Sequence, residues 1–361
     1  MRVVQVSPFY SPVVGGVETV VRQVAEYLAS RGVESWVVTY DRLRRGKAKL
    51  PREEEIGGVK VIRLRPDLKW SHGTYSRELI PYLQRLRPDV VHVHVWRHPH
   101  VFQVAKIEGL TKVLQPHSPF YGLTQVGPLI RVYYALTDLL GGKTMRKYRV
   151  VSITPLERDR LREVFGVSSD LIPNGIPDSL FSLSPGRSDH YLFLGRISRE
   201  KNVMLMLRAF KSSGVNRKLI MAGPDGGLGH TVRRFVERNA LNVDYLGPVS
   251  SETKMEMIRN CRAVLNPSPY EGFGITLLEG EAMGKPAIIV GRGGQEYAAP
   301  PNVASIRAEN SEFSVAEAVR AMEDDEIHSK LSVGARMWAE NFKLSKVLPR
   351  FLSLYESLTR R

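Results

Sequence analysis

Short apolar runs alternate with amphipathic helical patterns along this 361-residue chain. The apolar run at 3–6 is followed by apolar residues at helical spacing across 17–28 and by a second run at 36–39. The same pattern predicts strands at 59–65, 90–95, 113–115 and 150–153, with helices at 77–87 and 156–165. Repeated strand–helix–strand units form mostly parallel sheets with right-handed crossovers. We therefore expect an α/β fold with a doubly wound parallel sheet in the first half.

The periodicity breaks at 172–190, IPNGIPDSLFSLSPGRSDH, where prolines, glycines and serines replace it. The alternation then restarts, with predicted strands at 190–194, 218–222, 243–246, 263–266 and 287–290, helices at 203–210 and 232–239, and a helical C-terminus. We interpret the break as a domain junction between residues 1–171 and 172–343. Two such Rossmann-like halves would face each other and enclose a cleft at the carboxyl ends of their strands.

The composition, 43% hydrophobic and 25% charged, is that of a globular protein. No apolar run approaches the ~20 residues of a membrane span, and the N-terminus is typical of a strand rather than a signal peptide. Cys261 is the single cysteine and cannot form a disulfide within the chain, so we expect a reducing compartment and an inert buried thiol. The expected location is the cytoplasm or the cytoplasmic face of a membrane.

The formal net charge of +15 is concentrated in the first half of the chain. It is densest at 42–52, and three glutamates follow at once at 53–55. A field of this kind attracts anions, including phospholipid head groups, nucleotides and nucleic acid. A solvated basic loop is the alternative interpretation of the same run.

The segment 266–286, NPSPYEGFGITLLEGEAMGKP, predicts a bare helix N-terminus framed by Glu271 and Glu279. Two prolines end a strand, Gly272 and Gly274 leave the loop without side chains, and apolar residues recur at helical spacing from Ile275. Backbone N–H groups and the positive end of the helix dipole bind anions, and a carboxylate accepts hydrogen bonds from sugar or ribose hydroxyls. This combination suits a nucleotide sugar.

Arg196 and Lys201 follow a predicted strand in the segment GRISREKN. An Arg fork and a Lys point charge at one strand end hold a diphosphate and stabilise the negative charge of its departure. A surface pair bonded to nearby acids is the alternative. The glutamate segment favours the phosphate role.

Gly15 and Gly16 lie between the first strand and the first helix, in SPFYSPVVGGVE. Glycines there let the backbone approach a ligand, and the next helix presents its N-terminus. The spacing is not G-x-G-x-x-G and no acidic residue clearly closes the second strand, which argues against a dehydrogenase. A tight turn without a ligand is the alternative.

Five of the nine histidines lie between residues 92 and 117. His92 and His94 share one face of a predicted strand. Imidazoles bind zinc, but the absence of nearby cysteine and the scattered acids favour hydrogen-bonding roles, and we expect no metal site. His117 is the functional candidate, because it ends a strand and would face the cleft. A hydrogen-bonded core position is its alternative.

In this order, the Gly15–Gly16 turn, the IPNGI segment, Arg196, Lys201 and the two glutamates resemble the retaining glycosyltransferases of family 4, which have the GT-B fold. The resemblance spans nearly the whole chain, and PYEGFGITLLEGEAMGKP is its most specific part.

The resemblance implies that Arg196 and Lys201 clamp a donor diphosphate. It implies that Glu271 orients the donor sugar, that Glu279 binds the ribose, and that His117 contacts the transferred sugar or the reacting centre. His117, Arg196, Lys201 and Glu271 would form the catalytic group. The remaining donor contacts would be Gly15, Gly16, Val249, Gly272, Phe273, Gly274 and Ile275.

The resemblance also implies that the last helix, 344–358, crosses back to the first domain, so that residues 344–361 belong to it. Three positions depart from the family pattern. Pro177 replaces the usual aspartate, with Asp178 one place later. The segment GRGGQEYAAPPNVASIR is short, which leaves the role of Glu296 open, and Asp225 in GPDGG receives no role.

We therefore expect a hexosyltransferase that moves a sugar from a UDP- or GDP-linked donor to an acceptor hydroxyl, with retention and without a cofactor. No Asp-x-Asp stands at a strand end, which favours transfer without a metal. A lipid-linked acceptor or a cell-surface glycan precursor is expected. Two alternatives are a sugar-nucleotide epimerase of similar fold and a basic nucleic-acid-binding protein, although the second lacks a recognisable binding motif and we expect no nucleic-acid partner.

The segment 128–149, PLIRVYYALTDLLGGKTMRKYR, bears on the acceptor. It is apolar on one side, and Lys143, Arg146 and Lys147 follow. Such a segment rests on an anionic membrane as a peripheral anchor and would collect a lipid-linked acceptor there. An ordinary helix packed on its domain explains the same apolar residues.

Overall fold

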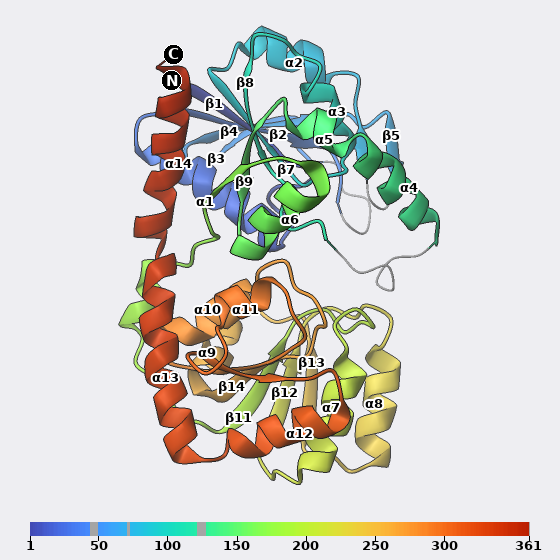
Figure 1. The fold of residues 1–361 in the computed structure, drawn as a ribbon, viewed down its shortest axis with the longest axis vertical. Coiled ribbons are helices and arrows are strands. Elements are labelled where there is room, and N and C mark those ends of the chain that lie inside the picture. Colours follow the sequence, from blue (N-terminus) through green and yellow to red (C-terminus); the bar gives the residue numbers. More distant parts are fainter. Residues whose placement is uncertain (44–49, 71–72, 121–127, 361) are drawn as a thin grey trace. The chain divides into compact units, whose positions relative to one another are not determined.

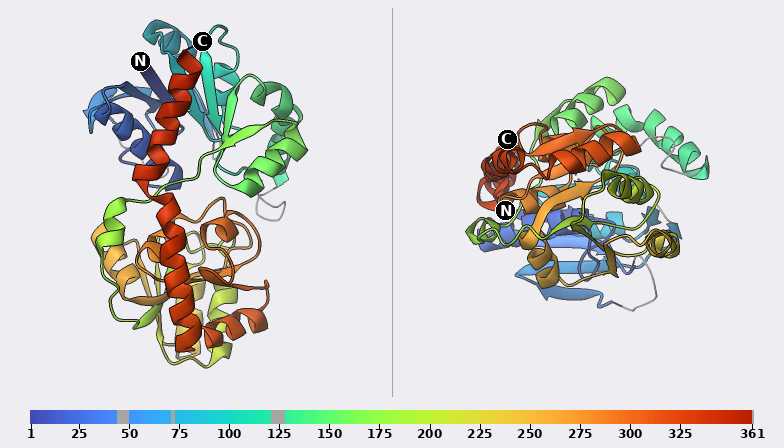
Figure 2. Two further views of the ribbon diagram at one scale, coloured as in Figure 1. Left: turned by 60° about the vertical axis from the view of Figure 1, so that its left-hand side comes forward. Right: turned by 90° about the horizontal axis from the view of Figure 1, so that it is seen from below.

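The structure is a computed structural model that describes residues 1–43, 50–70, 73–120 and 128–360. The chain divides into two compact units, residues 1–175 with 345–361 and residues 176–344 (Figures 1 and 2). The sequence places the junction after residue 171 and the return after residue 343, four residues and one residue from these boundaries. Part of the basic run, residues 44–49, lies outside the described residues.

The first unit contains a mostly parallel sheet in the order β10-β9-β8-β7-β1-β2-β4-β3. Its strands are β1 (Arg2–Val6), β2 (Glu34–Tyr40), β3 (Glu53–Ile56), β4 (Val59–Leu64), β7 (Val90–His94), β8 (Thr111–Gln115), β9 (Arg149–Ser152) and β10 (Ser169–Leu171). Only β3 pairs antiparallel among the pairings of this sheet in the described residues. A separate antiparallel pair joins β5 (Leu68–Trp70) to β6 (Gly73–Tyr75).

The helices of the first unit are α1 (Gly16–Ser30), α2 (Leu79–Leu86), α3 (Pro99–Val104), α4 (Pro128–Leu139), α5 (Gly141–Met145) and α6 (Pro155–Phe165). The apolar stripe of α1 buries Val21 and Ala25 against β2 and β4. Residues of α2, α3 and α6 form the larger core against the sheet. The predicted α/β order of this half is therefore confirmed.

The second unit contains a wholly parallel sheet in the order β13-β12-β11-β14-β15-β16. Its strands are β11 (His190–Leu194), β12 (Lys218–Ala222), β13 (Val243–Gly247), β14 (Cys261–Asn266), β15 (Ala287–Val290) and β16 (Ser305–Ala308). Its helices are α7 (Val203–Ser213), α8 (Gly229–Arg238), α9 (Ser251–Asn260), α10 (Ile275–Ala282), α11 (Gly294–Ala298), α12 (Glu312–Ala321) and α13 (Asp325–Ala339). This is the strand order of a dinucleotide-binding fold.

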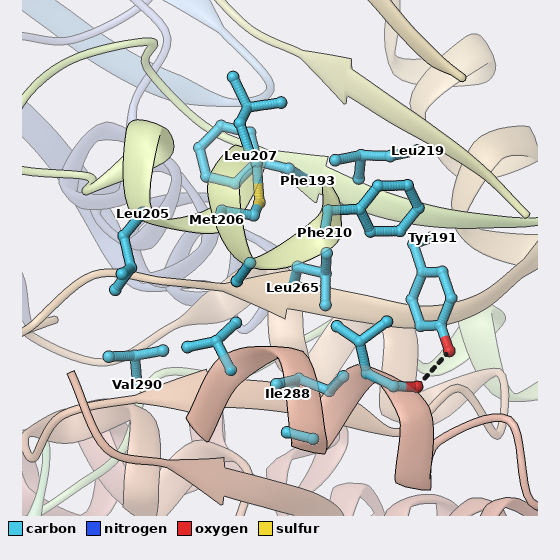
Figure 3. Close-up of a cluster of buried hydrophobic side chains, with 14 of the residues drawn as sticks. Tyr191, Phe193, Leu205, Met206, Leu207, Phe210, Leu219, Leu265, Ile288 and Val290 are labelled. Atoms are coloured by element: carbon cyan, nitrogen blue, oxygen red, sulfur yellow. Dashed lines mark hydrogen bonds between the residues drawn. The ribbon is translucent and has the colours of Figure 1, made fainter. Parts of the chain in front are cut away.

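The main core of the second unit lies between its sheet and the helices α7 and α12. Figure 3 shows Phe193 and Leu265 of the strands beside Met206 and Phe210 of α7. Tyr191 is fully buried, and its hydroxyl donates to the carbonyl of Val319 at 3.1 Å. A polar group inside a core needs such a partner, because an unpaired hydroxyl costs about 1–3 kcal/mol.

The last helix, α14 (Leu344–Thr359), belongs to the first unit from Ser345 onward. Phe351 and Tyr355 are buried, and Phe351 packs 5.8 Å from the ring of His92 in β7. The Tyr355 hydroxyl lies 2.7 Å from His92 Nδ1. The C-terminus therefore completes the core of the domain that begins the chain.

Several strands have no counterpart in the sequence prediction, namely β3, β5, β6, β10 and β16. Strand β3 consists of Glu53–Ile56 and pairs along the edge of the sheet. Its Glu54 forms an ion pair with the buried Arg63 of β4. Charged residues are common on edge strands, where they block further pairing, so this strand lacks the apolar signal.

The described part of the chain contains no helix long and apolar enough to span a bilayer.

Replacement of Phe351 by alanine tests the contribution of α14 to the first unit. Loss of a buried phenylalanine leaves a cavity, and we expect the free energy of unfolding of that unit to fall by roughly 3–5 kcal/mol. The control is Phe313→Ala in α12, where the ring is exposed. Urea unfolding followed by tryptophan fluorescence measures both variants. Equal midpoints for both would contradict the packing of α14 described above.

Candidate functional site

The candidate residues fall into two groups, one on each unit. In the second unit, β11 and β14 are neighbours, and the connections that follow them leave in opposite directions along the sheet order. Ligands of open parallel sheets bind beyond the carboxyl ends of the strands at such a switch point. Arg196 and Lys201 follow β11, and Glu271 follows β14.

Lys201 and Glu271 meet at this switch point. The Lys201 ammonium forms an ion pair with Glu271 Oε1, and Ser268 Oγ donates to the same oxygen at 2.6 Å. The Glu271 backbone N–H donates to Gln295 Oε1 at 2.9 Å, and the N–H of Gly294 donates to the Glu271 carbonyl at 2.8 Å. Four contacts from three separate segments therefore fix the position of Glu271.

The predicted bare helix N-terminus is present at α10. Gly274 precedes the helix with φ of 104°, which favours glycine, and no side chain caps the first turn. A Cβ on Gly294 would lie 2.0 Å from the carbonyl oxygen of Gly272. The loops after β14 and β15 therefore pack backbone to backbone, which holds the uncapped N-terminus in place.

Glu279, further along α10, forms a second ion pair. Its carboxylate accepts from the Lys254 ammonium at 2.7 Å. Burial raises the pKa of Glu279 above its usual value, and the Lys254 charge opposes that increase. Lys254 lies near the start of α9, which Ser250 caps, and Val249 immediately precedes that cap. The sequence prediction named Val249 and missed Lys254. The position of Lys254 after a predicted strand was a usable signal.

Arg196 lies against the glycine-rich turn after β12. A Cβ on Gly226 would meet the Arg196 side chain at 2.7 Å, so this glycine lets the turn pack on the arginine. Asp225 accepts from the N–H groups of Gly227 and Gly229, at 2.7 and 2.9 Å. Asp225, which the sequence left without a role, therefore orders this turn.

Glu296, whose role the sequence also left open, forms an ion pair with Arg307 at 3.0 Å. Cys261 is buried, and burial raises the pKa of its thiol to about 12. It is therefore the inert thiol that was expected.

In the first unit, Gly15 precedes α1 with an extended backbone, and Gly16 begins the helix without a side-chain cap. This turn follows β1, whose neighbours in the sheet are β2 and β7. The connection from β1 leads to β2 and the one from β7 leads to β8, on the other side. The turn therefore lies at the switch point of this sheet, as the corresponding loops do in the second unit.

His117 lies two residues beyond β8 in a left-handed turn, with φ of 60°, and Ser118 follows with φ of 55°. Its Nε2 lies 3.0 Å from His94 Nδ1, and His94 Nε2 lies 2.5 Å from Gln5 Oε1. A carbonyl oxygen only accepts, so His94 carries its proton on Nε2 and accepts from His117 with Nδ1. The chain of contacts leaves Nδ1 of His117 as its unprotonated nitrogen.

Glu157 anchors the His117 turn, and sequence reasoning missed it. Its Oε1 accepts from the backbone N–H of Ser118 at 2.6 Å, and its Oε2 accepts from the N–H of Ile153 at 2.7 Å. Burial raises the pKa of Glu157 to about 7 against these two hydrogen bonds. The sequence signal was Thr154 and Glu157 at capping-box spacing, in which Thr154 caps α6.

Of the clustered histidines, His92, His94 and His100 are buried, and His117 is half-buried. Burial lowers the pKa of His92 and His117 to about 3 and that of His100 to about 4. Across the described ranges, no three histidine, cysteine, aspartate or glutamate side chains are arranged to hold a metal ion.

Comparisons with known proteins give the same result for both units. A family profile described as Glycosyltransferase Family 4 matches residues 14–180, and one described as Glycosyl transferases group 1 matches residues 181–338. A GDP-mannose-dependent α-(1-6)-phosphatidylinositol dimannoside mannosyltransferase of Mycobacterium tuberculosis is 27% identical, over 80% of this chain and 79% of its own. An uncharacterized glycosyltransferase of Methanocaldococcus jannaschii, MJ1607, is 26% identical over 81% of both chains.

Solved structures share the fold. Sucrose-phosphate synthase from Thermosynechococcus elongatus superposes with a TM-score of 0.82 and 20% identity, over 99% of this chain and 98% of its own. Anabaena HepE in complex with UDP and glucose superposes with a TM-score of 0.76 and 14% identity, over 99% of this chain and all of its own.

The buried histidines make the stability of the first unit depend on pH. A histidine whose pKa is lowered by folding stabilises the folded state above about pH 6.5, the pKa of the unfolded chain. This stabilisation is lost as the pH falls below that value, because the unfolded chain then binds protons that the folded chain does not. Glu157, whose pKa is raised to about 7, acts in the opposite sense between about pH 4.5 and 7. Four imidazoles outweigh one carboxyl, so we expect a net loss of roughly 2–4 kcal/mol between about pH 7.5 and 5.5.

The measurement is urea unfolding of a Trp338→Phe variant, because the other tryptophans, 36, 70 and 96, all belong to the first unit. A midpoint that rises on acidification over this range would contradict the burial of neutral imidazoles.

Proposed function

Because the chain belongs to the family 4 glycosyltransferases of group 1 and has their GT-B fold, we propose that it moves a sugar from a nucleoside-diphosphate donor to an acceptor hydroxyl with retention of configuration. The observation that carries this proposal is the contact between Lys201 and Glu271 beside the uncapped N-terminus of α10. It brings a cation, a carboxylate and free backbone N–H donors to the carboxyl edge of the sheet.

We assign the donor to the second unit. Arg196 and Lys201 bind its diphosphate, together with the N-terminus of α10 at Gly272, Phe273 and Gly274. Both contacts of the Glu271 carboxylate use Oε1, so Oε2 is the oxygen that we assign to a sugar hydroxyl. We also assign Ile275 and Val249 to positions beside the donor.

Glu279 accepts the ribose hydroxyls in this proposal. Lys254 holds the Glu279 carboxylate in its buried position, so the acceptor oxygens are oriented before the donor arrives. In the first unit, the turn at Gly15 and Gly16 is assigned to the donor phosphates, and His117 to the transferred sugar. The chain from Gln5 through His94 orients the His117 ring.

In this mechanism, cleavage of the donor's glycosidic bond runs ahead of formation of the new bond. The transition state resembles an oxocarbenium ion with a departing diphosphate, and stabilisation of that anion is the main electrostatic task. Arg196, Lys201 and the positive end of the α10 dipole supply positive charge at the same strand ends. We propose that these groups replace a metal ion.

The proposed donor is UDP- or GDP-linked. The mannosyltransferase named above uses GDP-mannose, and the HepE structure contains UDP. The acceptor of the same mannosyltransferase is a phosphatidylinositol dimannoside. That name supports a lipid-linked acceptor for this chain as well, and we propose a cytoplasmic location at the membrane face.

A thermal-shift screen of nucleoside diphosphates and nucleotide sugars tests the donor. A ligand at 100 times its Kd stabilises the folded state by about 2.7 kcal/mol. We expect one of UDP and GDP to raise the melting temperature. If release of that diphosphate requires an acceptor, the enzyme is a transferase. Release of the diphosphate or isomerisation of the donor without an acceptor would favour the epimerase instead.

Lys201→Ala removes one of the two diphosphate cations. We expect kcat to fall by roughly 100-fold or more, because the lost charge acts mainly on the departing diphosphate. The control is Lys211→Ala at the other end of α7, where the lysine is exposed and contacts Asn239. Assays of acceptor-dependent diphosphate release measure both. Wild-type rates in Lys201→Ala, with circular dichroism unchanged, would contradict the assignment.

Glu279→Ala tests the ribose site. A hydrogen bond to a charged acceptor contributes about 1.5–3 kcal/mol, so we expect kcat/KM for the donor to fall by roughly tenfold to a hundredfold. Glu256→Ala, on the exposed face of α9, should leave the donor kinetics unchanged. Isothermal titration with the nucleoside diphosphate gives the affinity directly, and equal affinities of the two variants would rule out the ribose role.

A further inference from the structure

Helix α4 presents its apolar residues to the outside of the first unit. Leu129, Val132, Leu136 and Leu139 recur at intervals of three, four and three, so they share one face. Their exposed fractions are 86%, 60%, 60% and 82%. The segment is therefore not an ordinary domain helix with its apolar stripe in the core, which was one of the two interpretations of the sequence.

The inner face of α4 is polar and aromatic. Asp138 forms an ion pair with the buried Arg97 at 2.7 Å and accepts from Trp96 Nε1 at 3.0 Å. The Arg97 guanidinium also lies 4.0 Å from the centre of the Tyr134 ring. A partly buried ion pair and a cation–π contact thus fix the rotation of the helix about its axis. The leucines point outward because these contacts hold the polar face inward.

Strand β5 extends the apolar surface. Trp70 packs edge-on against Tyr133 of α4, with ring centres 6.0 Å apart. Leu68, Trp70 and Tyr75 of the β5–β6 pair are all exposed. Figure 1 shows α4 and β5 at the periphery of the first unit. Tryptophan and tyrosine are the residues that membrane interfaces favour, because one end of each ring is apolar and the other is wet.

Basic residues lie close in sequence to this surface. Residues 128–147 carry Arg131, Lys143, Arg146 and Lys147 and one acid, Asp138, which is held by Arg97. Lys69 is exposed in β5. A second copy of the chain, related by a two-fold axis, would bring these cations against each other. Anionic lipid instead gains about 1 kcal/mol for each Lys or Arg near its surface.

We propose that the outward face of α4, together with β5, docks on an anionic lipid bilayer and lies in its interface. This inference rests on the lipid-linked acceptor of the proposed function, and it identifies the surface that brings the first unit to that acceptor. A helix of 12 residues is about 18 Å long. It lies along the interface with its leucines among the acyl chains and its polar face on the protein.

The test is co-sedimentation of the full chain with vesicles. One set contains phosphatidylcholine and phosphatidylglycerol in equal parts, and the other contains phosphatidylcholine alone. We expect binding to the anionic vesicles that weakens as salt rises, because screening reduces the attraction between the lysines and the lipid. Equal binding to both sets, or no binding to either, would overturn the proposal.

A matched pair of double variants tests the face itself. Val132→Ser with Leu136→Ser changes two residues one turn apart on α4, and Val333→Ser with Met337→Ser changes two on α13, where the exposed fractions are 60% and 69%. We expect the first variant to bind anionic vesicles roughly tenfold or more weakly, since two apolar side chains no longer enter the bilayer. The second should bind as the wild type does. An equal loss in both variants, or none in the α4 variant, would contradict the proposal.

Two measurements on the same preparations separate the alternatives. Analytical ultracentrifugation without vesicles detects a second copy as the occupant, and a dimer that dissociates in the α4 variant would overturn the membrane proposal. The nucleoside-diphosphate thermal shift should be the same in all three proteins. Loss of that shift in every protein would count against the donor site, whereas loss of vesicle binding alone counts against the α4 surface.

Discussion

The contact between Lys201 and Glu271 depends on the order of strands in the second sheet. The loops after β11 and β14 meet because these strands are neighbours, although 70 residues separate the two side chains. The connections from these two adjacent parallel strands run in opposite directions, which leaves space at the carboxyl edge of the sheet. Glycines in the loops there keep that space free of bulky side chains. The uncapped start of α10 follows the second of these loops.

Two carboxylates of the candidate site in the second unit are each paired with a lysine. Lys201 is paired with Glu271, and Lys254 with Glu279, so neither carboxylate is buried without a cation. An isolated buried charge would cost several kcal/mol, so each lysine offsets the burial of its carboxylate and holds it in place. In the proposed function, the donor would therefore meet carboxylates that lysines already hold in position.

The sequence predicted those parts of the molecule whose signals are local. The loop and helix around Glu271 were predictable because prolines, glycines and helical spacing are read from adjacent residues. Lys254 and Glu157 were missed, although their positions near helix starts were readable from the sequence. Their contacts with Glu279 and Ser118 join residues 25 and 39 positions apart, and only the fold brings these residues together.

Helix α4 shows the same limit in another form. Periodicity revealed an apolar stripe at Leu129–Leu139, but it could not show which way the stripe faces. That direction is set by Arg97, which lies on a separate segment and holds Asp138 inward. In β3, the glutamates at 53–55 hid a strand, because pairing at a sheet edge requires no apolar residues.

The packing of α14 on the first unit also bears on synthesis at the ribosome. Residues 176–344 are continuous, whereas the first unit is completed only by residues 345–361. The nascent chain therefore has all residues of the second unit before it has the last helix of the first. Until Phe351 and Tyr355 emerge, the face of β7 around His92 has no cover, and the half that is translated first is the half that finishes folding last.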